Sequence, residues 1–218
     1  MIIRMDFNNK IVIIDKPKNI SSAFCLNLFK KRFNIKKAGH NGTLDPLASG
    51  VLVVATNKRT KELSQLNQDD KQYLVKLKFN THTDSYDRLG KVIRTTNYVP
   101  EIKQLNDYLT SLDNHSFYQL PPNFSALKVN GVRAYQLARK AVDFELEKRP
   151  TTIYKAKLIS YYDDYAEILL DVKKGFYVRS FVVDLASQFN TTAMMVDLVR
   201  TRSGQYSLKD VIDYQFNK

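Results

Sequence analysis

An alternating pattern in residues 71–80 constrains the fold of this chain more than any other feature. Apolar side chains recur at every second position and lysines lie between them, which is typical of a strand with one buried face. The apolar positions are Tyr73, Val75, Leu77 and Phe79. Such a strand needs neighbouring strands on its edges and a covering layer on its apolar face, so the chain must build a sheet with helices packed against it.

The rest of the chain supplies both kinds of element. Short apolar runs predict buried strands at residues 11–14 and 51–55, and two β-rich segments follow at 153–162 and 166–173. Three helices are predicted: from Ser22 to Phe33 with Phe24, Leu28 and Phe29 inward; after Pro100 with Ile102, Leu105, Leu109 and Leu112 inward; and from Val178 to Phe189. Strands dominate without strict strand–helix alternation. The prediction is therefore an α+β fold, a mixed and mainly antiparallel sheet flanked by helices, in one domain spanning residues 1–218.

Composition narrows the class of protein and of partner. The 218 residues include 34 Lys and Arg against 22 Asp and Glu, which gives a net charge of +12. A surface of this charge attracts polyanions such as nucleic acid, although a biased codon supply would also raise the lysine content. A single cysteine, no apolar run of membrane-spanning length and no secretory signal predict a cytoplasmic protein without a disulfide.

The segment 39–50 is the most unusual stretch of the chain. Three glycines, one proline and small polar residues predict a loop with special backbone angles between a helix and a buried strand. Its one carboxylate, Asp45, lies among apolar neighbours and needs a partner to stay ionised. Arg179, at the start of an apolar helix, is a candidate partner. A turn aspartate and a surface arginine are the alternatives that these residues alone leave open.

Six ordered segments resemble the bacterial tRNA pseudouridine-55 synthases, the TruB family. The segment 39–50 resembles the catalytic motif of that family. The other matching segments are Lys16–Ser22, Asp70–Tyr73, Thr81–Gly90, Gln119–Lys128 with the residues that follow it, and Lys174–Arg179. The resemblance covers nearly the whole chain. It implies the pseudouridine synthase fold with a central RNA-binding cleft and an RNA-binding insertion at about residues 115–145. Many relatives carry a C-terminal PUA domain, which is not expected here because the sequence ends at Lys218.

The resemblance also implies the reaction and its residues. A tRNA uridine in the T loop is isomerised to pseudouridine after it is turned out of its stack, without a cofactor. The implied catalytic residues are Asp45, Tyr73 and Arg179. The implied uridine contacts are His40, Tyr73, Tyr177 and Leu198, and the implied RNA contacts are Lys16, Lys61, Lys128, Arg139 and Arg200. Whether Asp45 attacks the ribose, attacks the base or removes a ribose proton stays open.

Departures from the family pattern occur close to these residues. Asn41, Asn19 and Phe176 stand where the family usually has Thr, Gly and Thr, and Val199 replaces an arginine. Asn tolerates the left-handed conformation, so Asn19 can replace glycine. Phe176 removes a hydroxyl.

Two functions other than a position-55 synthase are compatible with these residues. One is a catalytically idle RNA-binding module, and the other is a synthase of different specificity. The retained Asp45, Tyr73 and Arg179 favour an enzyme. The partner is expected to be the T arm of tRNA, with no membrane and no metal, since the three histidines are far apart in sequence. A monomer is expected.

Overall fold

The computed structural model describes residues 6–66 and 70–212, which fall into two compact units. The units are residues 1–74 with 197–218, and residues 75–196. That the whole chain forms a single domain stays a prediction. Within the described residues, no helix is long and apolar enough to cross a membrane.

The first unit is organised around strand β3 (Ser49–Thr56), which is almost entirely buried. Strand β1 (Ile11–Lys16) pairs with it antiparallel along its whole length, and the short β2 (Ala38–Asn41) also pairs antiparallel. Strand β12 (Ala193–Ser203) runs parallel to β3, with Arg200 opposite Gly50. The remaining elements are β13 (Tyr206–Ser207), α1 (Ser22–Arg32), η1 (Asn57–Glu62), α2 (Leu63–Leu66) and η2 (Leu208–Asp210).

Helix α1 begins where the sequence predicts but buries a different stripe. The hydroxyl of Ser21 accepts a hydrogen bond from the amide of Phe24 and caps the helix. The inward placement of Phe24 is wrong, because its side chain is 52% exposed. The buried stripe has the spacing i, i+3, i+4, i+7 and consists of Ser22, Cys25, Leu26 and Phe29. It packs with β1 and β3 residues into one core cluster.

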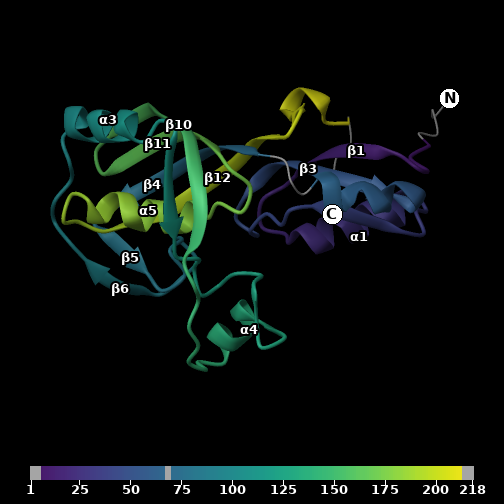
Figure 1. Cartoon of the computed structure of the whole chain (residues 1–218), viewed down its shortest axis with the longest axis horizontal. Coiled ribbons are helices and arrows are strands. Elements are labelled where there is room, and N and C mark those ends of the chain that lie inside the picture. Colours follow the sequence, from purple (N-terminus) through teal and green to yellow (C-terminus); the bar gives the residue numbers. More distant parts are fainter. Residues whose placement is uncertain (1–5, 67–69, 213–218) are drawn as a thin grey trace. The chain divides into compact units, whose positions relative to one another are not determined.

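The second unit is a mainly antiparallel sheet with helices (Figure 1). Its strand order is β4 (Lys71–Phe79), β11 (Tyr165–Val172), β10 (Arg149–Tyr162) and β7 (His115–Gln119). Residues 71–74 of β4 belong to the first unit. The alternation predicted for β4 is confirmed, since every second residue is buried. The helices are α3 (Ile102–Ser111) and α5 (Val178–Ser187). Ile102 is 57% exposed, so its predicted inward position is wrong, whereas Leu105 and Leu109 are buried.

Two smaller pieces leave the sheet of the second unit. One is a hairpin of β5 (Thr81–Thr83) and β6 (Val92–Thr95). The other holds β8 (Lys128–Val129), β9 (Val132–Arg133) and α4 (Ala134–Arg139). The predicted insertion began at residue 115, but residues 115–119 form β7, which pairs with β10 through Gln119 and Arg149. We therefore define the insertion as residues 120–148. Figure 1 shows it extending away from the strands of its unit.

Asparagine occupies most of the left-handed backbone positions. Among the described residues, eleven non-glycine residues have positive φ, and eight of them are asparagines. These are Asn9, Asn19, Asn34, Asn57, Asn80, Asn114, Asn130 and Asn190. The interpretation of Asn19 as a substitute for glycine is confirmed by its φ of 66°.

The α+β class, a mixed and mainly antiparallel sheet with flanking helices, is confirmed. Its predicted elements agree with the structure for β1, β3, β10, β11 and α5. Pattern reasoning succeeded at these segments because their apolar spacing is unambiguous.

Candidate active site

The loop that carries Asp45 is shorter than the sequence suggested. Residues 38–41 form β2 and residues 49–56 form β3, so the loop proper spans residues 42–48. Asp45 is half-buried in the middle of this loop, while Leu44, Leu47 and Ala48 are buried around it. The Asp45 side chain is therefore next to buried apolar residues and is itself partly exposed to solvent.

Side chains and backbone of residues 19–22 hold this loop in place. The hydroxyl of Ser22 accepts a hydrogen bond from the amide of Leu44 at 2.8 Å and donates to the Leu44 carbonyl at 3.0 Å. The amide of Asn19 donates to the Pro46 carbonyl at 2.7 Å. Both neighbours of Asp45 are thus fixed by direct bonds. Such fixation preorganises a reacting group, since little entropy remains to be lost when substrate arrives.

Lys16 lies beneath the same segment rather than on the surface. It has no exposed area, and its ammonium donates to the carbonyls of Pro17 and Ile20, each at 2.8 Å. Burial lowers the pKa of Lys16 to about 8, although the negative charge of Asp45 acts in the opposite direction. The ammonium of Lys16 is thus bonded to backbone oxygens inside the first unit, and the RNA contact expected for Lys16 stays a prediction.

Arg200 is a further buried cation of the first unit. Only 1% of its surface is exposed, and its guanidinium donates to the carbonyls of Val51 at 2.7 Å and Gly42 at 3.3 Å. The Gly42 bond supports the start of the Asp45 loop. Arg200 therefore also has internal acceptors where the sequence suggested an RNA contact.

His40 lies on β2, opposite Val54 of β3, and not in a loop as expected. Its side chain is partly buried, and its Nδ1 atom has no hydrogen-bond partner among the described residues. Burial lowers the pKa of His40, and the positive charge of Arg200 lowers it further. The imidazole is therefore neutral at physiological pH, and its Nδ1 atom can still accept or donate one hydrogen bond.

Tyr73 and Leu198 complete the candidate residues of the first unit. Tyr73 lies on β4 and is 9% exposed, and Leu198 lies on β12 and is 5% exposed. Both are positioned by regular strands, which hold side chains more firmly than loops do.

Arg179 is the central candidate of the second unit. It lies in the first turn of α5, is 6% exposed, and donates to the carbonyls of Ser85 at 3.1 Å and Phe124 at 2.9 Å. The carboxylate of Asp87, also buried, lies 4.0 Å from its Nε atom. Arg179 is thereby fixed between the β5–β6 turn and the insertion.

Sequence reasoning missed the role of Asp87. Asp87 accepts hydrogen bonds from the Leu89 amide at 2.9 Å and the Ser85 hydroxyl at 2.8 Å, which brace the turn between β5 and β6. The available signal was that Asp87 is an acidic residue of the matching segment Thr81–Gly90. Arg179 lies in a different matching segment, Lys174–Arg179. Nothing in the sequence linked the two segments in space.

Tyr177 precedes α5 and is half-buried. Gln119 accepts a hydrogen bond from the Tyr177 amide at 2.8 Å and donates to the Tyr177 carbonyl at 3.0 Å. The adjacent Phe176 packs its ring against Phe117 and Phe181, with centroid distances of 6.4 and 5.8 Å. At this position the chain thus has aromatic packing instead of the threonine hydroxyl that is usual in the family.

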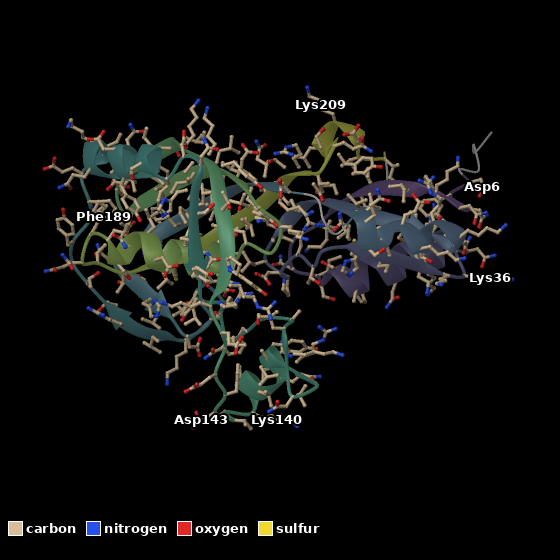
Figure 2. All side chains as sticks on the ribbon, in the orientation of Figure 1. Asp6, Lys36, Lys140, Asp143, Phe189 and Lys209 are labelled. Atoms are coloured by element: carbon tan, nitrogen blue, oxygen red, sulfur yellow. The ribbon has the colours of Figure 1, made fainter. Side chains whose placement is uncertain are left out.

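Three candidate RNA contacts are exposed. Lys61 lies on η1, Lys128 on β8 and Arg139 on α4, where the guanidinium of Arg139 lies 5.5 Å from the ring centre of Tyr135. Figure 2 shows Lys140 and Asp143 at the end of the insertion, far from the strands of its unit. Lys61, Lys128 and Arg139 are therefore accessible from solvent.

The candidate residues are divided between the two units. His40, Asp45, Tyr73 and Leu198 belong to the first unit, and Tyr177 and Arg179 belong to the second. The expected pairing of Asp45 with Arg179 stays a prediction. In the part of the chain that is described, no three His, Cys, Asp or Glu side chains are grouped to hold a metal ion.

Known proteins resemble this chain over most of its length. Residues 30–178 match the TruB family pseudouridylate synthase (N terminal domain). The chain is 40% identical over 210 residues to tRNA pseudouridine synthase B of Ureaplasma urealyticum serovar 10, covering 95% of this chain and 92% of that protein. It is 43% identical to the protein of the same name from Mycoplasma capricolum, covering 93% and 70%.

A solved structure shares the fold. A chain in the crystal structure of a Cbf5-Nop10-Gar1 complex is 26% identical and has a TM-score of 0.71. The match covers 92% of this chain and 50% of that one, so the present chain spans half the length of its structural relative.

Proposed function

Because the chain belongs to the TruB family of pseudouridylate synthases, we propose that it converts the T-loop uridine at position 55 of tRNA to pseudouridine. The relatives at about 40% identity are named for action on tRNA, and the chain covers 92% of the Ureaplasma protein. The observation that carries the proposal is the half-buried Asp45 carboxylate on a loop whose flanking residues, Leu44 and Pro46, are bonded to residues 19–22.

The reaction breaks the bond between N1 of uracil and the ribose, turns the base, and joins C5 to the ribose. No atom is gained or lost, so the proposed chemistry includes no cofactor. Asp45 supplies the carboxylate that acts as nucleophile or base. Arg179 is its proposed charge partner, held for this role by Asp87.

The uridine must leave its stack before Asp45 can reach it. Extrusion costs a few kcal/mol, which aromatic stacking worth about 1–3 kcal/mol per base can offset. Tyr73, Tyr177 and Leu198 are the proposed contacts of the turned-out base. A neutral His40, with an open ring nitrogen, is the proposed occupant of the space that the uridine leaves.

The exposed cations Lys61, Lys128 and Arg139 are the proposed phosphate contacts. Lys16 and Arg200 are assigned to support of the Asp45 loop, since both donate to backbone carbonyls inside the first unit.

The test is the conversion of an unmodified tRNA transcript by the purified protein, with the modified position mapped on the product. Asp45→Asn should abolish turnover and retain tRNA binding, because it removes the charge and keeps the shape. Asp107→Asn is the matched control, since Asp107 lies on the exposed face of α3 in an ion pair with Lys103. Full activity of Asp45→Asn would overturn the assignment. Binding by the unaltered protein without pseudouridine would indicate an idle RNA-binding module, and product at another uridine would indicate a different specificity.

A further inference from the structure

One buried side chain holds both polar backbone groups of Tyr177. Gln119, the last residue of β7, is 2% exposed. Its amide oxygen receives the Tyr177 N–H at 2.8 Å, and its amide nitrogen donates to the Tyr177 carbonyl at 3.0 Å. The two bonds fix this peptide in position and orientation, in the way that a neighbouring strand would.

Tyr177 depends on this support because of its place in the chain. It is the residue that precedes α5, its backbone is extended with φ −105° and ψ 104°, and its own side chain forms no capping bond to the helix. Two residues earlier, Gly175 has a φ of 82°. The segment is therefore neither strand nor helix, and regular secondary structure does not hold it.

Two further bonds anchor the same helix start. The hydroxyl of Ser180 donates to the Leu120 carbonyl at 2.7 Å, and Arg179 donates to the Phe124 carbonyl at 2.9 Å. Residues 119–124 are thus joined to residues 177–180 at three points. Gln119 differs from the other two anchors because it is the one that acts on Tyr177.

We infer that Gln119 is a positioning residue for the reaction: it sets the orientation of Tyr177 against the turned-out uridine. The inference rests on the proposed function. A neutral amide suits this task, since it offers one donor and one acceptor at every pH, as the facing peptide requires. A shift of the Tyr177 ring by 1 Å would be enough to cost rate.

The test compares three variants in single-turnover and steady-state assays on a tRNA transcript. Gln119→Met keeps the length of the side chain and removes both bonds. Gln119→Glu keeps the acceptors and restores the donor only when its carboxyl is protonated. Gln104→Met is the matched control, because Gln104 also accepts a bond from a backbone amide at a helix start, that of Glu101 at 3.0 Å.

Gln119→Met should lower kcat by about tenfold or more with KM for tRNA changed by less than about twofold, since phosphate contacts are untouched. Gln104→Met removes a backbone bond at an exposed helix start and should keep its kcat. The activity of Gln119→Glu relative to the unaltered protein should rise as the pH is lowered from 8.5 to 5.5, as a protonated carboxyl regains the donor.

An unaltered kcat in Gln119→Met, or the same loss in Gln104→Met, would overturn the inference. So would an activity of Gln119→Glu that keeps a constant ratio to the unaltered protein across this pH range. Failure of the proposed function is distinguishable, because the unaltered protein itself would then form no pseudouridine.

Discussion

Gly50 offers a sharp test of how the Asp45 loop is attached to the sheet. It is the second residue of β3, directly after Ser49, has a φ of +105°, and lies opposite Arg200 of β12. A Cβ atom at this position would lie 2.3 Å from the carbonyl oxygen and 2.8 Å from the amide nitrogen of Arg200. Both are backbone atoms of a buried strand, so neither can turn aside. Gly50→Ala must therefore separate β3 from β12.

Two costs add in this variant. The left-handed conformation costs an alanine about 1–2 kcal/mol, and overpacking a filled interior costs about 1–3 kcal/mol. The free energy of unfolding should fall by about 2–5 kcal/mol. At about 2–4 °C per kcal/mol for a protein of this size, a central loss of about 3 kcal/mol lowers Tm by roughly 6–12 °C.

Gly42→Ala is the matched control, because it lies in the same unit and also has a positive φ, +72°. Its added Cβ would lie 3.5 Å from a guanidinium nitrogen of Arg200, an ordinary contact. It should carry the conformational cost alone, about 1–2 kcal/mol. Thermal and urea unfolding followed by circular dichroism measure both variants. If Gly50→Ala is as stable as Gly42→Ala, the close approach of β3 and β12 is refuted.

Three further predictions concern other parts of the chain. Lys16→Met should reveal the cost of burying an ammonium. The pKa of Lys16 is about 8 in the folded protein and near 10.5 in the unfolded chain. The contribution of Lys16 to the free energy of unfolding is therefore greatest above pH 10.5 and smallest below about pH 8. Urea unfolding should show the native protein gaining up to about 3 kcal/mol on the methionine variant between pH 7 and 10.5, and a constant difference would contradict the burial. Phe176→Thr restores the residue usual in the family, yet should lower the free energy of unfolding by about 2–4 kcal/mol in a denaturant titration, because it empties the space between two phenylalanine rings; equal stability would show that the cluster contributes nothing. Lys128→Gln should weaken tRNA binding and reduce the slope of log K against log salt by about 0.7–0.9, and an unchanged slope would remove Lys128 from the phosphate contacts.

The fold was predictable from the sequence wherever apolar spacing alone decides burial. The alternation in β4 and the stripe in α5 are examples, since each repeats with the period of its element. The stripe of α1 was misplaced because its true first member is Ser22. A serine becomes a core residue here only because its hydroxyl is bonded to Leu44. Periodicity of apolar residues does not detect such a partner.

The motifs single out Asp45, Arg179 and Tyr177 as candidates, and their roles stay predictions. What the motifs do not show is the set of contacts that each side chain makes. The RNA contacts expected for Lys16 and Arg200 stay predictions. The groups that bind these two side chains inside the protein are backbone carbonyls, which every residue possesses and no sequence pattern marks. Burial of a cation is decided by the shape of the fold around it.

The asparagines with positive φ carry a consequence for protein engineering. Each of these eight positions tolerates glycine sterically, and several lie in exposed turns far apart from one another. At Asn9, Asn57 and Asn80 the side chain also accepts hydrogen bonds, which glycine would remove. At exposed positions such as Asn34, Asn114 and Asn130, exchanges combine nearly additively, so relief of local strain would accumulate into a gain in heat resistance. The same positions also explain how a chain with only seven glycines makes so many reversals of direction.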